Sequence, residues 1–93
     1  MTGRGSDVSP EGRQGLPAPD LELDCRDLRC PMPVIELGRH IDDVEAGQVV
    51  GVVARDVAAR VDVPAWCRMR RHEYVGEDTA ADGAPRYLVR RLS

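Results

Sequence analysis

The sequence predicts an α/β two-layer sandwich in the order β-α-β-α-β-β, with a four-stranded mixed sheet and two helices packed on one face. Three patterns indicate this fold: apolar and polar residues that alternate, an apolar stripe at helical spacing, and a short run that is apolar throughout. The chain of 93 residues has the size of one small domain. Its core is expected to be aliphatic, because Val is abundant and Phe is absent.

The first strand is expected to begin where the composition of the chain changes. Residues 1–20 are rich in Gly, Pro, Ser and charged residues, so we expect a flexible tail that buries too little apolar surface to become ordered. Leu21, Leu23 and Cys25 then alternate with charged residues and are expected to point inward. The predicted domain therefore spans residues 21–93.

A first helix is predicted over residues 31–44. Its apolar residues share one stripe (Val34, Leu37, Ile41 and Val44). Gly47 is expected to stop this helix, because glycine is common just after a helix end.

A central strand and a second helix are expected next. Residues 48–54 are continuously apolar, apart from Gln and Gly, as in a covered strand. Asp56 is a suitable N-cap for the helix that follows. Pro64 is expected to kink or restart this helix, so that residues 64–71 form a separate turn.

The end of the chain predicts a β-hairpin. Residues 72–78 and 86–92 have the composition of strands. Asp82-Gly83 lies between them and supplies the turn chemistry of a hairpin. These two strands complete the four-stranded sheet.

Composition excludes several classes of function. The net charge is −3, which argues against a dedicated nucleic-acid binder, so no direct nucleic-acid partner is expected. All 13 basic residues are Arg, which excludes lysine-based covalent catalysis. No run approaches the ~20 apolar residues of a membrane span, and residues 1–20 lack the apolar core of a signal peptide. We therefore expect a cytoplasmic protein with reduced thiols and no membrane association.

Cys30 is the candidate reactive residue because of the helix that is predicted to follow it. If the helix begins at Pro31, Cys30 is the N-cap, and Pro31 occupies the first position, which proline tolerates best. Pro33 stiffens the same turn. The positive end of the helix is expected to lower the pKa of the thiol moderately. Neighbouring charges act in both directions: two arginines favour the thiolate and two aspartates oppose it (Arg26, Arg29, Asp24 and Asp27).

The two other cysteines and the two histidines are weaker candidates for a reactive or metal-binding site. Cys25 is expected to be a buried small hydrophobe. Cys67 either packs beneath the second helix or provides a second thiol, and we favour the first interpretation. The spacing of Cys25 and Cys30 matches neither a CxxC redox motif nor a common zinc site, and His40 and His72 complete no ligand set. No metal and no cofactor are expected.

At this point the sequence shows a resemblance to a known family. The stretch LDCRDLRCPMP, residues 23–33, resembles the signature of the TusA/SirA sulfur-carrier family, a CPxP motif that follows a first strand. The similarity continues through residues 56–67 and ends in the paired strands that finish YLVRR. It covers residues 21–92.

The resemblance implies a two-layer sandwich whose CPxP cysteine carries persulfide sulfur between two proteins. Cys30 would be the carrier, Pro31 and Pro33 structural parts of the motif, and three neighbours its support (Asp24, Arg26 and Arg29). The implied sulfur donors are cysteine desulfurases or rhodanese-like proteins. The implied acceptors belong to tRNA 2-thiolation, sulfur oxidation or molybdenum-cofactor assembly.

One departure and two alternatives remain at this stage. The family usually has Gly where this chain has Asp27, and the added charge is expected to weaken the thiolate or to alter partner choice. The protein could instead be a non-catalytic regulatory or RNA-associated module. It could also be a thiol redox switch that pairs Cys30 with Cys25 or Cys67, which requires Cα atoms within about 7 Å.

Overall fold

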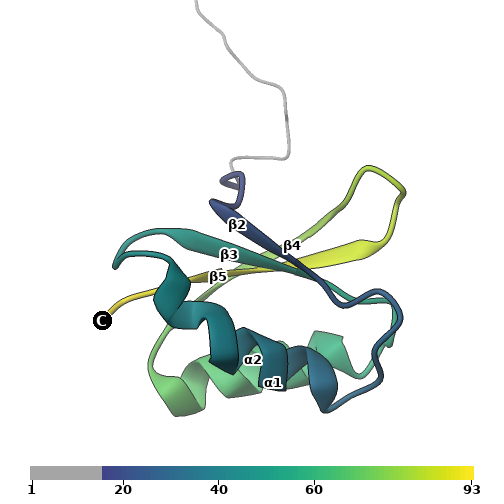
Figure 1. The fold of residues 1–93 in the computed structure, drawn as a ribbon, viewed down its shortest axis with the longest axis horizontal. Coiled ribbons are helices and arrows are strands. Elements are labelled where there is room, and N and C mark those ends of the chain that lie inside the picture. The colour runs from purple at the N-terminus through teal and green to yellow at the C-terminus, as the bar shows by residue number, and fades with distance from the viewer. Residues whose placement is uncertain (1–15) are drawn as a thin grey trace, which may run out of the picture.

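The predicted two-layer architecture is confirmed in a computed structural model, which describes residues 16–93 (Figure 1). The elements are β2 (Leu21–Asp24), α1 (Met32–His40), the 3-10 helix η1 (Ile41–Asp43), β3 (Val49–Val53), α2 (Ala59–Arg70), β4 (Glu73–Thr79) and β5 (Pro85–Arg90). The sheet order is β2-β3-β5-β4, with β2 parallel to β3 and the two other pairs antiparallel. Both helices cover the same face of this sheet. Neither helix has the length and apolar composition needed to cross a membrane.

The core lies between the sheet and the two helices. Leu23 pairs with Val52, and Val52 pairs with Tyr87, so these side chains point to the same face of the sheet. Leu37 of α1 and Val63 of α2 are fully buried against that face. The inward side chains of the strands therefore pack against the apolar stripes of the helices, as the sequence predicts.

Helix α1 is shorter than predicted. It begins at Met32, with Pro31 as its N-cap, and ends at His40. The 3-10 turn η1 continues the chain, a common way for a helix to finish. Ile41 and Val44 remain buried in spite of this change, so the apolar stripe keeps its function. Gly47 (φ 93°) lies in the turn before β3 and does not stop the helix.

Helix α2 runs through Pro64 without a break, so the predicted separate turn at residues 64–71 is wrong. Proline removes only one backbone hydrogen bond donor, and the residues around it hold the helix in place. Val63, Trp66 and Cys67 are all buried against the core. Packing of this face therefore outweighs the local preference of proline.

Residues 16–20, which were expected to belong to the flexible tail, lie along the face of the sheet that the helices leave open. The Asp20 amide donates a hydrogen bond to the carbonyl of Val49 (2.7 Å), and the Val49 amide donates one to the Asp20 carboxylate (2.9 Å). Pro19 lies close over Gly51, where an added Cβ would be 3.1 Å from the proline ring. The rest of the predicted tail, residues 1–15, lies outside the described part of the chain.

Candidate functional site

Cys30 lies in the loop between β2 and α1, at the edge of the core. It is not the N-cap, as predicted, but stands one residue before the cap, Pro31. Its side chain is half-buried and packs against the core cluster, while Pro33 is buried within the first turn. The thiol therefore lies at the start of a helix, as expected, but against apolar side chains that the sequence pattern did not place there.

The carboxylate of Asp56 joins the Cys30 loop to the start of α2. The Cys30 amide donates a hydrogen bond to Asp56 Oδ2 (3.0 Å), and the Ala58 amide donates one to Asp56 Oδ1 (3.0 Å). These bonds, first from Ala58 and then from Cys30, lower the pKa of the Asp56 carboxyl. The helix N-cap is Ala58, so Asp56 caps the turn before α2 rather than the helix itself. The sequence indicates only a capping role for Asp56 and contains no signal for its contact with Cys30, which lies 26 residues away in the chain.

The expectation of a lowered Cys30 pKa is wrong. Burial, first, and then the neighbouring carboxylates of Asp62 and Asp56 together raise the pKa of the thiol to about 11. Both aspartates belong to the first turns of the α2 region and reach the thiol only through the tertiary fold. Partial desolvation and two nearby negative charges therefore outweigh the favourable end of α1. The resting thiol is protonated at neutral pH.

Arg26, expected to support the thiolate, is instead a clamp between loops. Its Nε donates to Asp82 (2.8 Å), in the turn between β4 and β5, and its Nη1 donates to Asp24 (3.0 Å). Asp24 also accepts the backbone amide of Arg26 (3.2 Å). These hydrogen bonds lower the pKa of both carboxyls. Asp24 and Arg26 therefore fix the loop that leads to Cys30, and the charge of Arg26 is balanced by the carboxylates of Asp24 and Asp82.

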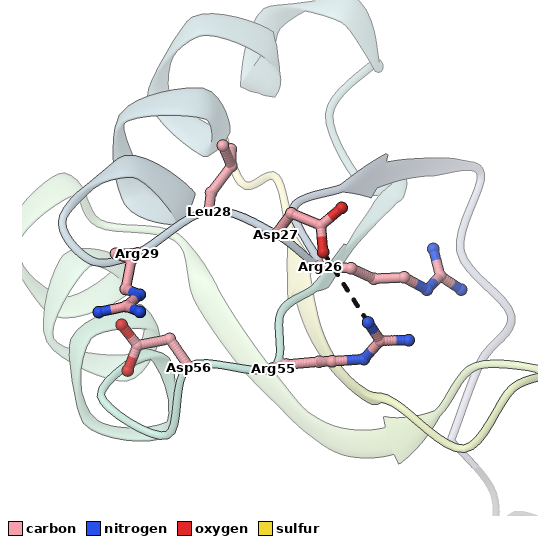
Figure 2. A pocket seen from close by; sticks show the side chains of 6 residues that line it. All are labelled: Arg26, Asp27, Leu28, Arg29, Arg55 and Asp56. Carbon is pink, nitrogen blue, oxygen red and sulfur yellow. Dashed lines mark ion pairs between the residues drawn. The ribbon is translucent and has the colours of Figure 1, made fainter.

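An open cavity of about 440 Å³ lies beside the Cys30 loop. Its lining residues are drawn in Figure 2 (Arg26, Asp27, Leu28, Arg29, Arg55 and Asp56). Arg29 points toward the Asp56 carboxylate, and its positive charge contributes to the low pKa of that group. Asp27 is 95% exposed and lies 3.9 Å from Arg55. Among the described residues Arg71 is the only non-glycine with positive φ, so the backbone at Asp27 is not strained.

Cys25 and Cys67 are buried, each only 1% exposed. Burial raises the pKa of Cys25 to about 11 and that of Cys67 to about 12. The prediction that Cys25 is a core residue is therefore confirmed. Cys67 lies on the buried face of α2 and packs in the core, which agrees with the interpretation that we favoured and not with a second accessible thiol. All three cysteines are unpaired, and burial of these two disfavours the redox-switch alternative.

The histidines have structural contacts. His40 Nδ1 lies 2.7 Å from a carboxylate oxygen of Asp43. His72 stacks on Trp66, with ring centroids 5.5 Å apart, and accepts the amide of Leu92 (3.1 Å). In residues 16–93, no group of three or more His, Cys, Asp or Glu side chains is placed to hold a metal ion.

The fold and the site together define a small α/β protein with one half-exposed thiol before its first helix. A profile of the family described as sulfurtransferase TusA matches residues 21–91, and the chain belongs to this family. Membership implies a sulfur carrier in a sulfur relay. A similar solved structure is a SirA-like protein from Desulfitobacterium hafniense, with a TM-score of 0.65 and 19% identity over 78% of this chain and 99% of that chain. At this identity the likeness supports the fold alone.

Proposed function

We propose that Cys30 accepts sulfur as a persulfide from a donor protein and passes it to an acceptor protein. The observation that carries this proposal is exposure: Cys30 is the one cysteine of the three that is not buried. Family membership adds the reaction class. The half-buried position of Cys30 leaves its sulfur within reach of a docked partner.

Sulfur transfer at Cys30 needs no oxidant and no cofactor. Cys30 loses its proton, and its thiolate attacks the terminal sulfur of the donor's persulfide. A new S–S bond forms at Cys30 while the S–S bond of the donor breaks, and the donor leaves as a thiolate that takes up a proton. The second transfer repeats this step, with the Cys30 persulfide as donor and a thiolate of the acceptor as nucleophile.

The surface around Cys30 supports protein partners. Exposed apolar side chains flank the residues that contact Cys30: Met32 in the first turn of α1, Val57 next to Asp56, and Val61 next to Asp62. Apolar side chains of this kind are typical of the buried centre of an interface. The donor is a cysteine desulfurase or a rhodanese-like protein, and the acceptor is a relay protein of tRNA 2-thiolation or of another sulfur pathway. The unpaired thiols of this chain favour the cytoplasm as the location of the protein.

Intact-mass measurement tests this assignment. Incubation with a cysteine desulfurase and cysteine should add the mass of one sulfur atom to the wild-type chain. Cys30→Ser should abolish the addition, whereas Cys25→Ser and Cys67→Ser should retain it. Addition of sulfur to Cys25 or Cys67 with Cys30 unmodified would contradict the proposal.

A further inference from the structure

The hydroxyl of Tyr87 is a buried polar group that lacks a partner. Tyr87 has no exposed surface, and among residues 16–93 nothing forms a hydrogen bond with its hydroxyl oxygen. Leaving such a group unpaired is unfavourable, and native proteins rarely do so without a reason. The unpaired donor therefore points to a partner that binds at this place.

The position of Tyr87 in the fold brings its hydroxyl to the Cys30 end of the helix layer. Tyr87 lies on β5 opposite Glu77 of β4, and the Glu77 carboxylate pairs with Arg60 of α2 through two hydrogen bonds of 2.9 Å. Cys30 is attached to the beginning of the α2 region through Asp56. Tyr87 also belongs to the core cluster against which Cys30 packs. The phenol thus lies beneath the first turns of α2, on the side where Cys30 is held.

Electrostatics agree with this placement. Burial raises the pKa of the Tyr87 hydroxyl, and the negative charges of Glu77, of Asp56 and of the Cys30 sulfur when it is ionised raise this pKa further, against the opposing charge of Arg60. The hydroxyl therefore keeps its proton and can donate a hydrogen bond. The nearby carboxylates already have donors, because Arg60 holds Glu77 and two backbone amides hold Asp56.

Of the groups near the Tyr87 hydroxyl, the Cys30 sulfur is the one that lacks a hydrogen-bond donor to stabilise a negative charge on it. Every neighbour that acts on the thiol raises its pKa, so within the described residues none stabilises a negative charge on this sulfur. A persulfide is more acidic than its parent thiol, and its terminal sulfur carries the charge. A carried sulfur therefore needs a donor that the resting thiol does not use.

We propose that the Tyr87 hydroxyl donates a hydrogen bond to the terminal sulfur of the Cys30 persulfide, forming an inner binding site for anionic sulfane sulfur. This inference rests on the proposed function of Cys30. In this site the terminal sulfur faces the core side of the loop and is shielded from small thiols in solution. Tyr87 thereby lengthens the lifetime of the carried sulfur between donor and acceptor.

The test compares Tyr87→Phe with the matched control Tyr74→Phe. Tyr74 also packs on the cluster, from β4, but the charges that act on its hydroxyl are those of Glu77, Tyr87, Cys67 and Arg60, not that of Cys30. Each protein is loaded with sulfur on Cys30, transferred to a fixed concentration of glutathione, and followed by intact mass. Tyr87→Phe should shorten the persulfide lifetime roughly tenfold, as loss of one hydrogen bond to a charged group implies. Its persulfide pKa should rise, so the pH profile of loss should shift to higher pH, while Tyr74→Phe should match the wild type.

An unchanged persulfide lifetime in Tyr87→Phe contradicts the inference. If the hydroxyl does not bind the carried sulfur, Tyr87→Phe leaves the persulfide lifetime at the wild-type value, and the inference is overturned. Because only loaded proteins are compared, this result leaves the role of Cys30 intact. The Tm of the unloaded chain should rise in either case, because the substitution removes an unpaired buried group. A wild-type chain that does not load at Cys30 overturns the proposed function and this inference together.

A second readout uses the unaltered protein. The NMR signal of the Tyr87 ring carbon that bears the hydroxyl should move when sulfur is loaded and should return when the persulfide is reduced. The same signal in Cys30→Ser, treated with the donor in the same way, should stay in place. A Tyr87 signal that does not respond to loading of the wild-type chain contradicts the inference, whatever the stability of the variant.

Discussion

The backbone amide of Cys30 donates a hydrogen bond to the carboxylate of Asp56, 3.0 Å away and 26 residues later in the chain. The other oxygen of the same carboxylate accepts the amide of Ala58. One side chain therefore sets the distance between the thiol loop and the start of α2. This link holds Cys30 near the carboxylate of Asp62 on α2, which raises the pKa of its thiol.

Asp56→Ala should loosen this link. Two backbone amides lose their acceptor, so we expect the Tm to fall by a few degrees. Loss of the Asp56 charge also lowers the Cys30 pKa, so the rate of sulfur loading is compared per Cys30 thiolate, and this rate should fall several-fold. Asp56→Asn is the matched variant, because its amide oxygen can still accept one hydrogen bond, and it should lie between the wild type and Asp56→Ala. Thermal unfolding and intact-mass kinetics measure both effects. Equal loading rates in all three proteins would show that the link has no role in transfer.

The raised pKa of Cys30 predicts a steep pH dependence of its reactivity. The thiolate is the reactive form, so iodoacetamide alkylation of Cys30 should increase about tenfold per pH unit from pH 7 to pH 10. Asp62→Asn removes a charge that raises this pKa, so the profile should shift to lower pH. Peptide mapping assigns the alkylated cysteine.

Asp27→Asn is the control for this titration. The Asp27 side chain is 95% exposed and is not among the groups that raise the Cys30 pKa, so its removal should leave the profile unchanged. A profile that levels off near pH 7 in the wild type would contradict the raised pKa. A shift in Asp27→Asn equal to that in Asp62→Asn would show instead that the charge next to the motif controls the thiol.

Cys67→Ser and Cys30→Ser should have opposite effects. Cys67 is buried, so a serine hydroxyl there lacks a partner and should reduce the free energy of unfolding by about 1–3 kcal/mol, with normal sulfur loading. Cys30→Ser should abolish loading and change stability little, because its side chain is only half-buried. Urea unfolding and intact mass measure the two properties. Loss of loading in Cys67→Ser at a temperature where it is folded would contradict the structural role of Cys67.

The Arg26 clamp predicts a sensitivity to acid. The hydrogen bond from Arg26 is the main reason why the pKa of Asp82 lies below its ordinary value of 3.8. The ionised Asp82 carboxylate therefore contributes fully to stability above pH 3.8. This contribution is lost as the pH falls through the lowered value of the folded state. Arg26→Gln should therefore lower the Tm at pH 7 and make the fall of the Tm in acid less steep. The control is Arg39→Gln, which alters an exposed arginine of α1 that lies 3.6 Å from Glu36. In this variant the Tm should fall in acid as steeply as in the wild type.

Local patterns were sufficient for the placement of the elements. The four strands and two helices lie where alternation, apolar runs and the helical stripe predict them, with ends that differ by a few residues. These patterns work because the side chains of a strand or helix face the core at a period that the backbone geometry imposes. Pro64 is the exception: a local rule predicted a break, and burial of Trp66 and Cys67 keeps α2 continuous.

The sequence by itself determined the order of the elements, the family resemblance and the choice of Cys30 as the candidate thiol, because each depends on neighbours in the chain. Only the tertiary structure decided the environment of that thiol. Asp56 and Asp62 act on Cys30 from 26 and 32 positions later in the chain, and burial together with these carboxylates reverses the pKa shift that the helix start predicts. Desolvation and charge interactions depend on distance in space, which the spacing of residues along the chain does not contain.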